Sequence, residues 1–158
     1  MDNGWGGDAH WMRRALKEAR EGAEAGEVPI GCVIVGEGGQ LLGRDHNRVE
    51  ALQDATAHAE ILAISAAART LGSWRLLGAT AYVTAEPCAM CMGAFHQARV
   101  DRVVYGAAEP KFGACGSRLD LTQLEGLNHT LRVEGGLLAD EAAELLREFF
   151  RTLRRKPT

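Results

Sequence analysis

Apolar residues along the chain recur with two periods, one typical of helices and the other typical of strands. Spacings of three and four residues predict amphipathic helices over 8–25 and 57–70. Between them, the apolar run 30–35 predicts a buried strand, and the glycine-rich turn 36–39 leads into a second strand over 40–44. We therefore expect the two strands to pair as a hairpin.

The second half of the chain continues to alternate strands with helices. It predicts strands over 79–84, 100–105 and 131–133, and helices over 88–98 and 139–155. This alternation indicates an α/β sandwich with at least one parallel crossover. No internal repeat or long linker divides the chain, so we expect one domain over 1–158, with residues 1–8 flexible.

Length and composition are those of an ordinary globular protein. The 158 residues correspond to about one domain, and 46% apolar with 25% charged residues argue against disorder and fibrous repeats. No apolar stretch approaches the roughly 18 residues that a membrane span requires. The N-terminus is polar and glycine-rich, which argues against a secretory signal and predicts a cytoplasmic protein without a membrane partner.

Charge and cysteine counts narrow the classes of function. Eighteen Lys and Arg against 21 Asp and Glu give a net charge of −3, which disfavours a chain that coats nucleic acid but allows a local basic patch. Four cysteines are too few for a disulfide scaffold. Cys32 and Cys115 stand alone with no assigned role, whereas Cys88 and Cys91 form a C-x-x-C pair.

Three candidate zinc ligands fall at predicted helix starts. Cys88 and Cys91 lie three residues apart after Pro87 and can share one helix face, and His58 lies at the start of the preceding helix. Crossover connections would bring both helix N-termini to the same edge of the sheet. Two thiolates and one imidazole leave a tetrahedral zinc with an open position, which is typical of a catalytic site.

Glu60 follows His58 by two residues and cannot comfortably bind the same metal, because the two side chains point about 200° apart on a helix. A carboxylate beside a zinc-activated water could shuttle its proton to a substrate. Alternatively, Glu60 could merely stabilise the helix start. If Cys115 supplied a fourth ligand, the site would be structural rather than catalytic.

H-x-E followed by P-C-x-x-C is the signature of the zinc-dependent nucleobase deaminases. Over nearly its whole length the chain also resembles one family of these enzymes, the bacterial tRNA-specific adenosine deaminases (TadA). The matching segments include 12–15, 27–31, 47–48, 56–61, 82–88, 102–107, 113–117, 128–129, 138–141 and 149–151. The resemblance implies a three-layer α/β/α sandwich of the cytidine deaminase type. Its central mixed sheet would have about five strands, with helices on both faces.

The resemblance also implies the reaction and its residues. One zinc per subunit would be held by His58, Cys88 and Cys91, with Glu60 as the proton shuttle, and the wobble adenosine of tRNA would be converted to inosine. Asn47 matches the residue that hydrogen-bonds the target purine. The further substrate-binding residues implied are Val28 and Pro29 as pocket walls, Ala59 through its backbone N–H, Glu86 through its carbonyl, and Glu109 through the nucleic-acid backbone.

Glu109 is also a departure from the family, which commonly has Asp at this position. A longer acid followed by Pro110 could preserve the contact with the nucleic-acid backbone or shift the tolerance for the sugar.

Basic and aromatic residues near the C-terminus suggest how RNA is held. Arg151 and Arg154 belong to a basic stripe on the last predicted helix, and Phe149 and Phe150 could dock that helix or stack a base. The stripe could also be only a solvated helix face. The resemblance implies contact with the anticodon stem-loop of tRNA, a further contact at Lys111, and a homodimer.

Two other functions remain open from the sequence. A deaminase of a free base or nucleotide, such as guanine, cytosine or dCMP, shares the zinc motif but has no need of a basic C-terminal helix. A zinc-stabilised RNA-binding module without enzymatic activity would need a fourth protein ligand and would not depend on Glu60.

Overall fold

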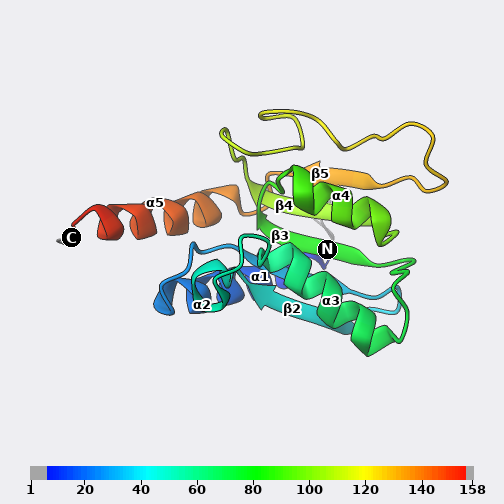
Figure 1. Ribbon diagram of the computed structural model, residues 1–158, viewed down its shortest axis with the longest axis horizontal. Helices are drawn as coiled ribbons and strands as arrows, with labels where there is room; N and C mark the ends of the chain where they lie inside the picture. The colour runs from blue at the N-terminus through cyan, green and yellow to red at the C-terminus, as the bar shows by residue number, and fades with distance from the viewer. Residues whose placement is uncertain (1–6, 156–158) are drawn as a thin grey trace.

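The computed structural model describes residues 7–155 and contains one five-stranded sheet between two layers of helices (Figure 1). The elements in chain order are α1 (Asp8–Glu24), β1 (Gly31–Val35), β2 (Leu41–His46), α2 (Val49–Leu52), α3 (Ala59–Leu71), β3 (Thr80–Ala85), α4 (Ala89–Gln97), β4 (Arg102–Ala107), β5 (Arg132–Gly135) and α5 (Ala139–Arg155). The α/β sandwich with a mixed sheet is therefore confirmed.

The strands lie in the order β2-β1-β3-β4-β5. The predicted hairpin is present, since β1 pairs antiparallel with β2, and β1 is also antiparallel to β3. The last two pairings, β3 with β4 and β4 with β5, are parallel. Because β2 and β3 both oppose β1, they run in the same direction, and the helices that follow them start at one edge of the sheet.

Alternate residues of the central strands face two separate cores, as the period of a strand requires. Cys32 and Ile34 of β1 belong to the core under α3 and α4, whereas Val33 and Val35 belong to the core under α1 and α5. All five residues of β1 are buried, because helices cover both faces of the sheet.

Several boundaries differ from the sequence expectations by one or two residues. One element was missed: the stretch after β2 contains the short helix α2. Of the segment expected to be flexible, residues 1–6 lie outside the described residues, and Asp8 begins α1 as a buried residue. Its carboxylate pairs with Arg102 at 2.7 Å and accepts the Tyr82 hydroxyl at 2.7 Å, so the start of α1 is tied to the sheet.

The last helix packs on the sheet only along its first half. Ala142 is buried, whereas Phe150 and Leu153 are exposed, and α5 continues away from the sandwich (Figure 1). None of the helices within residues 7–155 combines the length and the apolar character needed to cross a bilayer.

Candidate active site

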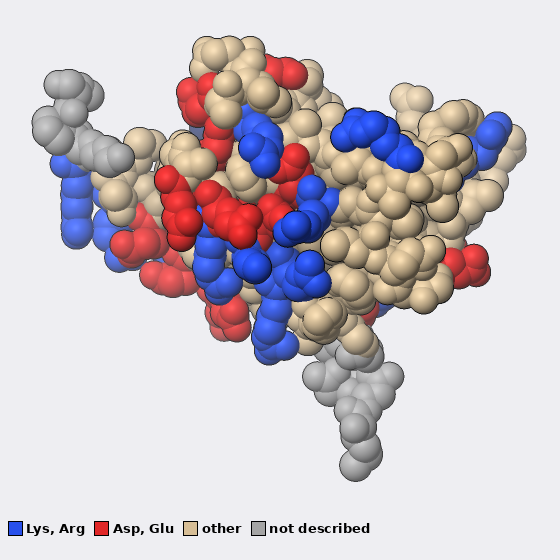
Figure 2. Space-filling view, turned by 90° about the horizontal axis from the view of Figure 1, so that it is seen from below, with Lys and Arg blue, Asp and Glu red and all other residues tan. Residues whose placement is uncertain are grey.

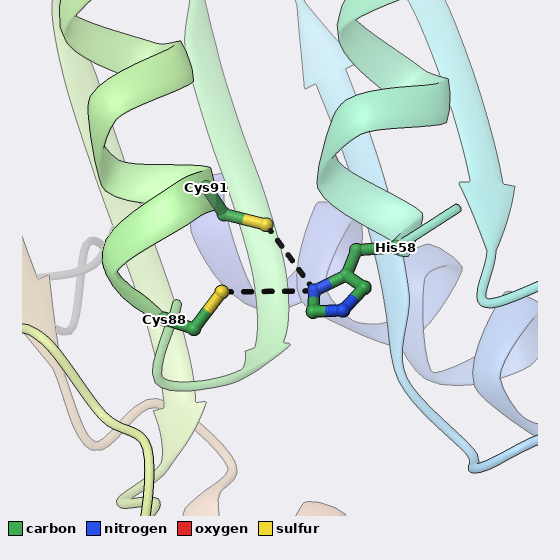
Figure 3. Close-up of side chains that lie close together, drawn as sticks. All are labelled: His58, Cys88 and Cys91. Atoms are coloured by element: carbon green, nitrogen blue, oxygen red, sulfur yellow. Dashed lines mark hydrogen bonds between the residues drawn. The ribbon is translucent and has the colours of Figure 1, made fainter. Parts of the chain in front are cut away.

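Two helix starts at the same sheet edge bring three potential metal ligands together. His58 is the N-cap of α3 and Cys88 is the N-cap of α4, both with extended backbone, and Cys91 lies in the first turn of α4. The helix expected from residue 57 thus begins two residues later, at Ala59. His58, Cys88 and Cys91 point toward one another from these two helices (Figure 3).

The separations of these atoms fit a tetrahedral zinc ion. His58 Nδ1 lies 3.6 Å from Cys88 Sγ and 3.5 Å from Cys91 Sγ. Zinc bonds of about 2.3 Å to sulfur and about 2.0–2.1 Å to nitrogen, at a tetrahedral angle, require an N···S separation of about 3.6 Å. Cys115 is not part of this cluster, since its sulfur contacts Met92 Sδ at 3.5 Å. Within the described chain the cluster therefore offers three ligands.

The two thiols share one negative charge when no cation is present. The hydrogen bond from Cys91 and then the one from His58 lower the pKa of Cys88 to about 4. The pKa of Cys91 is raised by its hydrogen bond to Cys88 and by burial. The hydrogen bond to Cys88 raises the pKa of His58. A divalent cation would replace these shared protons, which is the behaviour expected of a thiolate metal site.

Glu60 lies in the first turn of α3, two residues after His58. Its side chain is buried, and burial raises the pKa of its carboxyl to about 7. After the hydrogen bond to Cys88 and burial, the negative charge of Glu60 also raises the pKa of Cys91. A carboxyl with a pKa close to neutral can both accept and release a proton, as a proton shuttle must.

A cleft of about 1130 Å³ opens over His58, Glu60 and Cys88. Asn47 lines it and fixes its own orientation, because its Oδ1 accepts the Ala59 N–H at 2.8 Å. This leaves the amide Nδ2 of Asn47 as the donor available to the cleft. The expectation that the Ala59 N–H faces the attacked group is not met, since Asn47 occupies that N–H.

The other residues expected to bind substrate are only partly brought together. Val28, Glu86 and Glu109 line the cleft, whereas Pro29 is buried and does not. Sequence reasoning missed Glu27, a buried carboxylate on the cleft wall. Its two oxygens accept the backbone N–H groups of Glu50 and Ala51 at 3.0 and 2.8 Å, which positions α2. The sequence did contain a signal for Glu27, because it is an acidic residue that directly precedes the predicted pocket walls Val28 and Pro29.

The side chain of Glu86 holds a loop, a role that the sequence did not predict, while the expected substrate contact of its backbone carbonyl stays a prediction. The buried carboxylate accepts the N–H groups of Glu109, Cys115 and Ser117 at 3.0, 2.8 and 3.1 Å, and also the Ser117 hydroxyl. Glu109 in turn accepts the Phe112 N–H through its own carboxylate. Glu86 therefore holds the loop that follows β4.

The far wall of the cleft is the apolar face of α5. Leu146, Phe149, Phe150 and Leu153 line it, at the spacing of one helix face. Neither of the arginines expected to contact RNA, Arg151 and Arg154, is a lining residue.

Ion pairs with acidic residues of the same helix reduce the positive charge of the predicted basic stripe on α5. Arg151 pairs with Glu148 at 2.8 Å, and the neighbouring Arg147 pairs with Glu144 at 2.7 Å, so both of these arginines are neutralised on their own helix. Figure 2 shows the same mixture on one face of the molecule, where basic and acidic side chains are interleaved. Bulk attraction for nucleic acid is therefore weak, in keeping with the net charge.

Comparison with known proteins places these features in a family. The family model of the MafB19-like deaminases matches residues 7–154. The tRNA-specific adenosine deaminase of Bacillus subtilis (strain 168) is 48% identical over 149 residues, which are 94% of this chain and 92% of that protein.

Two solved structures are similar across most of the chain. One, from a study of A-to-I editing by tRNA:A34 deaminases at the wobble position, is 46% identical with a TM-score of 0.82, covering 87% of this chain and 99% of the other. The other, a guanine deaminase from Nitrosomonas europaea, is 30% identical with a TM-score of 0.77, covering 89% and 83%.

Proposed function

Because the chain belongs to the MafB19-like deaminases and, within them, to the tRNA-specific adenosine deaminases, we propose that it converts adenosine at the first anticodon position of tRNA to inosine. The reaction adds water at C6 of adenine and releases ammonia. The near-full-length identity of 48% to the Bacillus subtilis enzyme supports this substrate. A tRNA substrate implies a cytoplasmic activity.

The spacing of the histidine nitrogen and the two cysteine sulfurs carries the chemical part of the proposal. His58, Cys88 and Cys91 would hold one zinc ion per subunit. When bound, zinc supplies the positive charge that makes the attacking water more acidic. Glu60 takes one proton from this water and delivers it to the purine ring nitrogen beside C6. It then takes the proton of the hydroxyl added at C6 and delivers it to the amine, which leaves as ammonia; a pKa of about 7 favours both transfers.

Residues of the cleft would hold the purine against the zinc site and Glu60. Asn47, locked by the Ala59 N–H, presents its Nδ2 as a hydrogen-bond donor to a ring nitrogen of the base. Val28 and the apolar face of α5 supply walls that exclude water from the reacting atoms.

The RNA contacts extend beyond the cleft. Lys111 borders the cleft, and Arg154 lies near the end of α5 with no ion pair of 4.0 Å or less to any described carboxylate. Both would meet phosphates of the anticodon stem-loop, because a free cation releases counterions when it binds RNA. The proposal includes a homodimer, as the family resemblance implies.

The substrate is tested with anticodon stem-loops that carry A, C or G at the first anticodon position, with free nucleosides and guanine in parallel. We expect inosine only in the stem-loop with A. The similarity to a guanine deaminase makes guanine the competing substrate. Deamination of guanine with no inosine formed in RNA would replace our proposal with that activity.

The proton shuttle is tested with Glu60→Ala. We expect this variant to keep its zinc and to lose roughly 10²–10⁴-fold in turnover, the contribution of general acid–base catalysis. Glu21→Ala, on the exposed side of α1, is the control and should retain full activity. Zinc content is measured alongside the rate, and near-normal turnover of Glu60→Ala would exclude the carboxyl from the mechanism.

A further inference from the structure

Asn47 is held through its backbone as well as through its side chain. Its N–H donates to the Ile30 carbonyl at 3.2 Å, and its side-chain oxygen accepts the Ala59 N–H at 2.8 Å. Its carbonyl accepts a hydrogen bond from Nδ1 of His46, also at 2.8 Å. Because a carbonyl oxygen can only accept, Nδ1 of His46 carries the proton. Three atoms of Asn47 therefore have protein partners, and its Nδ2 is left for the cleft.

The side chain of His46 lies behind Asn47 and not in the cleft. His46 is the last residue of β2, opposite Gly31 of β1, and it is buried. Its ring lies against α1 at Gly22, where a Cβ would come within 3.1 Å of the ring atoms Cγ and Nδ1. His46 is not among the described residues that line the cleft, whereas Asn47 and Val49 are. His46 would therefore act on a substrate through the residues that follow it.

Two carboxylates lie beside the His46 ring. A ring nitrogen of His46 and carboxylate oxygens of Glu18 and Asp45 lie within 4.8 Å of one another. Asp45 also accepts the His46 N–H at 2.8 Å. Both acids already have an arginine as counter-ion, Arg44 at 3.0 Å from Glu18 and Arg48 at 2.8 Å from Asp45. A metal ion would compete with these arginines, so the group is suited to fix an imidazole rather than to bind a cation.

We propose that His46 is a positioning residue for the reaction: its Nδ1–H holds the Asn47 carbonyl, so that Nδ2 of Asn47 stays directed at the target base. The inference rests on the proposed function, in which Asn47 binds the purine. A buried carbonyl without a donor is costly, so loss of the histidine would favour rotation of the peptide that joins residues 47 and 48. The carbonyl and the side chain of Asn47 share one Cα, so the amide would lose its fixed direction.

The first test needs no substrate. His46→Phe keeps a ring but removes the donor, and His46→Asn restores an N–H at the position of Nδ1. His46→Gln places its N–H further out, near the position of Nε2. We expect hydrogen exchange at the Ala59 amide of the zinc-loaded protein to accelerate about 5- to 150-fold in His46→Phe and His46→Gln, the cost of a buried acceptor without a donor. His46→Asn should exchange at nearly the wild-type rate.

The second test separates positioning from a general loss of stability. Binding of anticodon stem-loops is measured in the Glu60→Ala background, so that the base is not turned over. The target position carries adenosine or its 1-deaza, 3-deaza or 7-deaza analogue, one of which lacks the ring nitrogen that Asn47 contacts. Asn47→Ala identifies this analogue, because the substitution causes no further loss of binding on it.

His46→Phe should show the same dependence on that one ring nitrogen. We expect it to bind the adenosine stem-loop about 2- to 13-fold more weakly, the range of one hydrogen bond, and to show little further loss on the analogue that Asn47→Ala identifies. His46→Asn should recover the binding, and His46→Gln should not.

His129→Phe is the matched control. Nε2 of His129 donates to the Val100 carbonyl at the same distance of 2.8 Å, but His129 precedes β5, at the opposite edge of the sheet from β2. The control should leave both the Ala59 exchange and the ranking of the four stem-loops unchanged.

Exchange at the wild-type rate in His46→Phe would overturn the inference, and so would equally fast exchange in His46→Asn and His46→Gln. An equal loss of affinity for all four stem-loops would show that His46 only supports the fold. The two proposals can fail separately. If wild type forms no inosine in the adenosine stem-loop while His46→Phe accelerates exchange at Ala59, only the proposed function is refuted.

Discussion

Replacement of Glu86 by glutamine tests whether one buried carboxylate organises the loop beside the candidate active site. The carboxylate has four donors: the N–H groups of Glu109, Cys115 and Ser117, and the Ser117 hydroxyl. Glutamine offers one oxygen and one NH₂ group. If its oxygen faces the Cys115 and Ser117 amides, its NH₂ group can donate to the Ser117 hydroxyl but meets the Glu109 N–H, donor against donor.

One backbone donor thus loses its acceptor, at a cost of about 1–3 kcal/mol. The remaining hydrogen bonds lose their charge assistance, so we expect a total of about 2–4 kcal/mol. Because the loss concerns a loop, it should appear as local opening. Amide hydrogen exchange at 109, 115 and 117 should accelerate by about 30- to 900-fold, the same free energy expressed as an opening equilibrium.

Acid should reproduce the effect in wild type. Burial alone would raise the pKa of Glu86, but the hydrogen bonds from Ser117, Glu109 and Cys115 outweigh it and lower the pKa. The stabilisation is therefore complete above the unfolded-state pKa and disappears as pH falls through the folded-state value. Exchange in wild type should approach that of Glu86→Gln at low pH.

Glu18→Gln is the matched control for this experiment. Glu18 is also a buried carboxylate, but its partner at 3.0 Å is Arg44, which belongs to the edge strand β2 and not to the β4 side of the sheet that carries this loop. Glu18→Gln should leave hydrogen exchange at the three loop amides unchanged. Equal exchange in wild type and Glu86→Gln at neutral pH would refute the assignment of Glu86 as the anchor of the loop.

Two other predictions concern stability. Asp8→Asn should lower the free energy of unfolding by about 1–3 kcal/mol at pH 7, because it removes one of the two carboxylates that pair with Arg102 and leaves only Glu134, at 2.8 Å. Burial alone would raise the pKa of Asp8, but hydrogen bonds with Arg102 and Tyr82 outweigh it and lower that pKa. The difference in unfolding free energy between wild type and Asp8→Asn, measured by urea unfolding, should therefore shrink as pH falls through the pKa of Asp8. A difference that stays constant with pH would contradict this. Removal of the metal with a chelator should lower the melting temperature, and stoichiometric zinc should restore it, because a ligand bound at about 1,000 times its Kd stabilises the fold by about 4 kcal/mol. Identical melting curves with and without chelator would argue against a bound ion.

The sequence by itself determined the order and type of the main elements and the residue types of the candidate metal site. Periodicity predicted the last helix with the bounds it has, Ala139–Arg155, because a helix face repeats over consecutive residues. The H-x-E and P-C-x-x-C motifs likewise identify His58, Cys88 and Cys91 by residue type and spacing alone. The short helix α2 was not predicted, because four residues flanked by polar ones are too few to show a helical periodicity.

Tertiary structure decided which partners these side chains meet. Asn47 occupies the Ala59 N–H, 12 residues away, and Glu86 reaches donors 23 to 31 residues along the chain. The acids that neutralise Arg151 were visible in the sequence, but their pairing depends on side-chain rotamers. The periodicity of apolar residues along the chain predicts which side chains are buried and where a helix ends. A hydrogen bond between residues far apart in the sequence forms only once the folded sheet has brought the two residues close together. That is why the candidate ligands could be named from the sequence, and why the loop anchor could not.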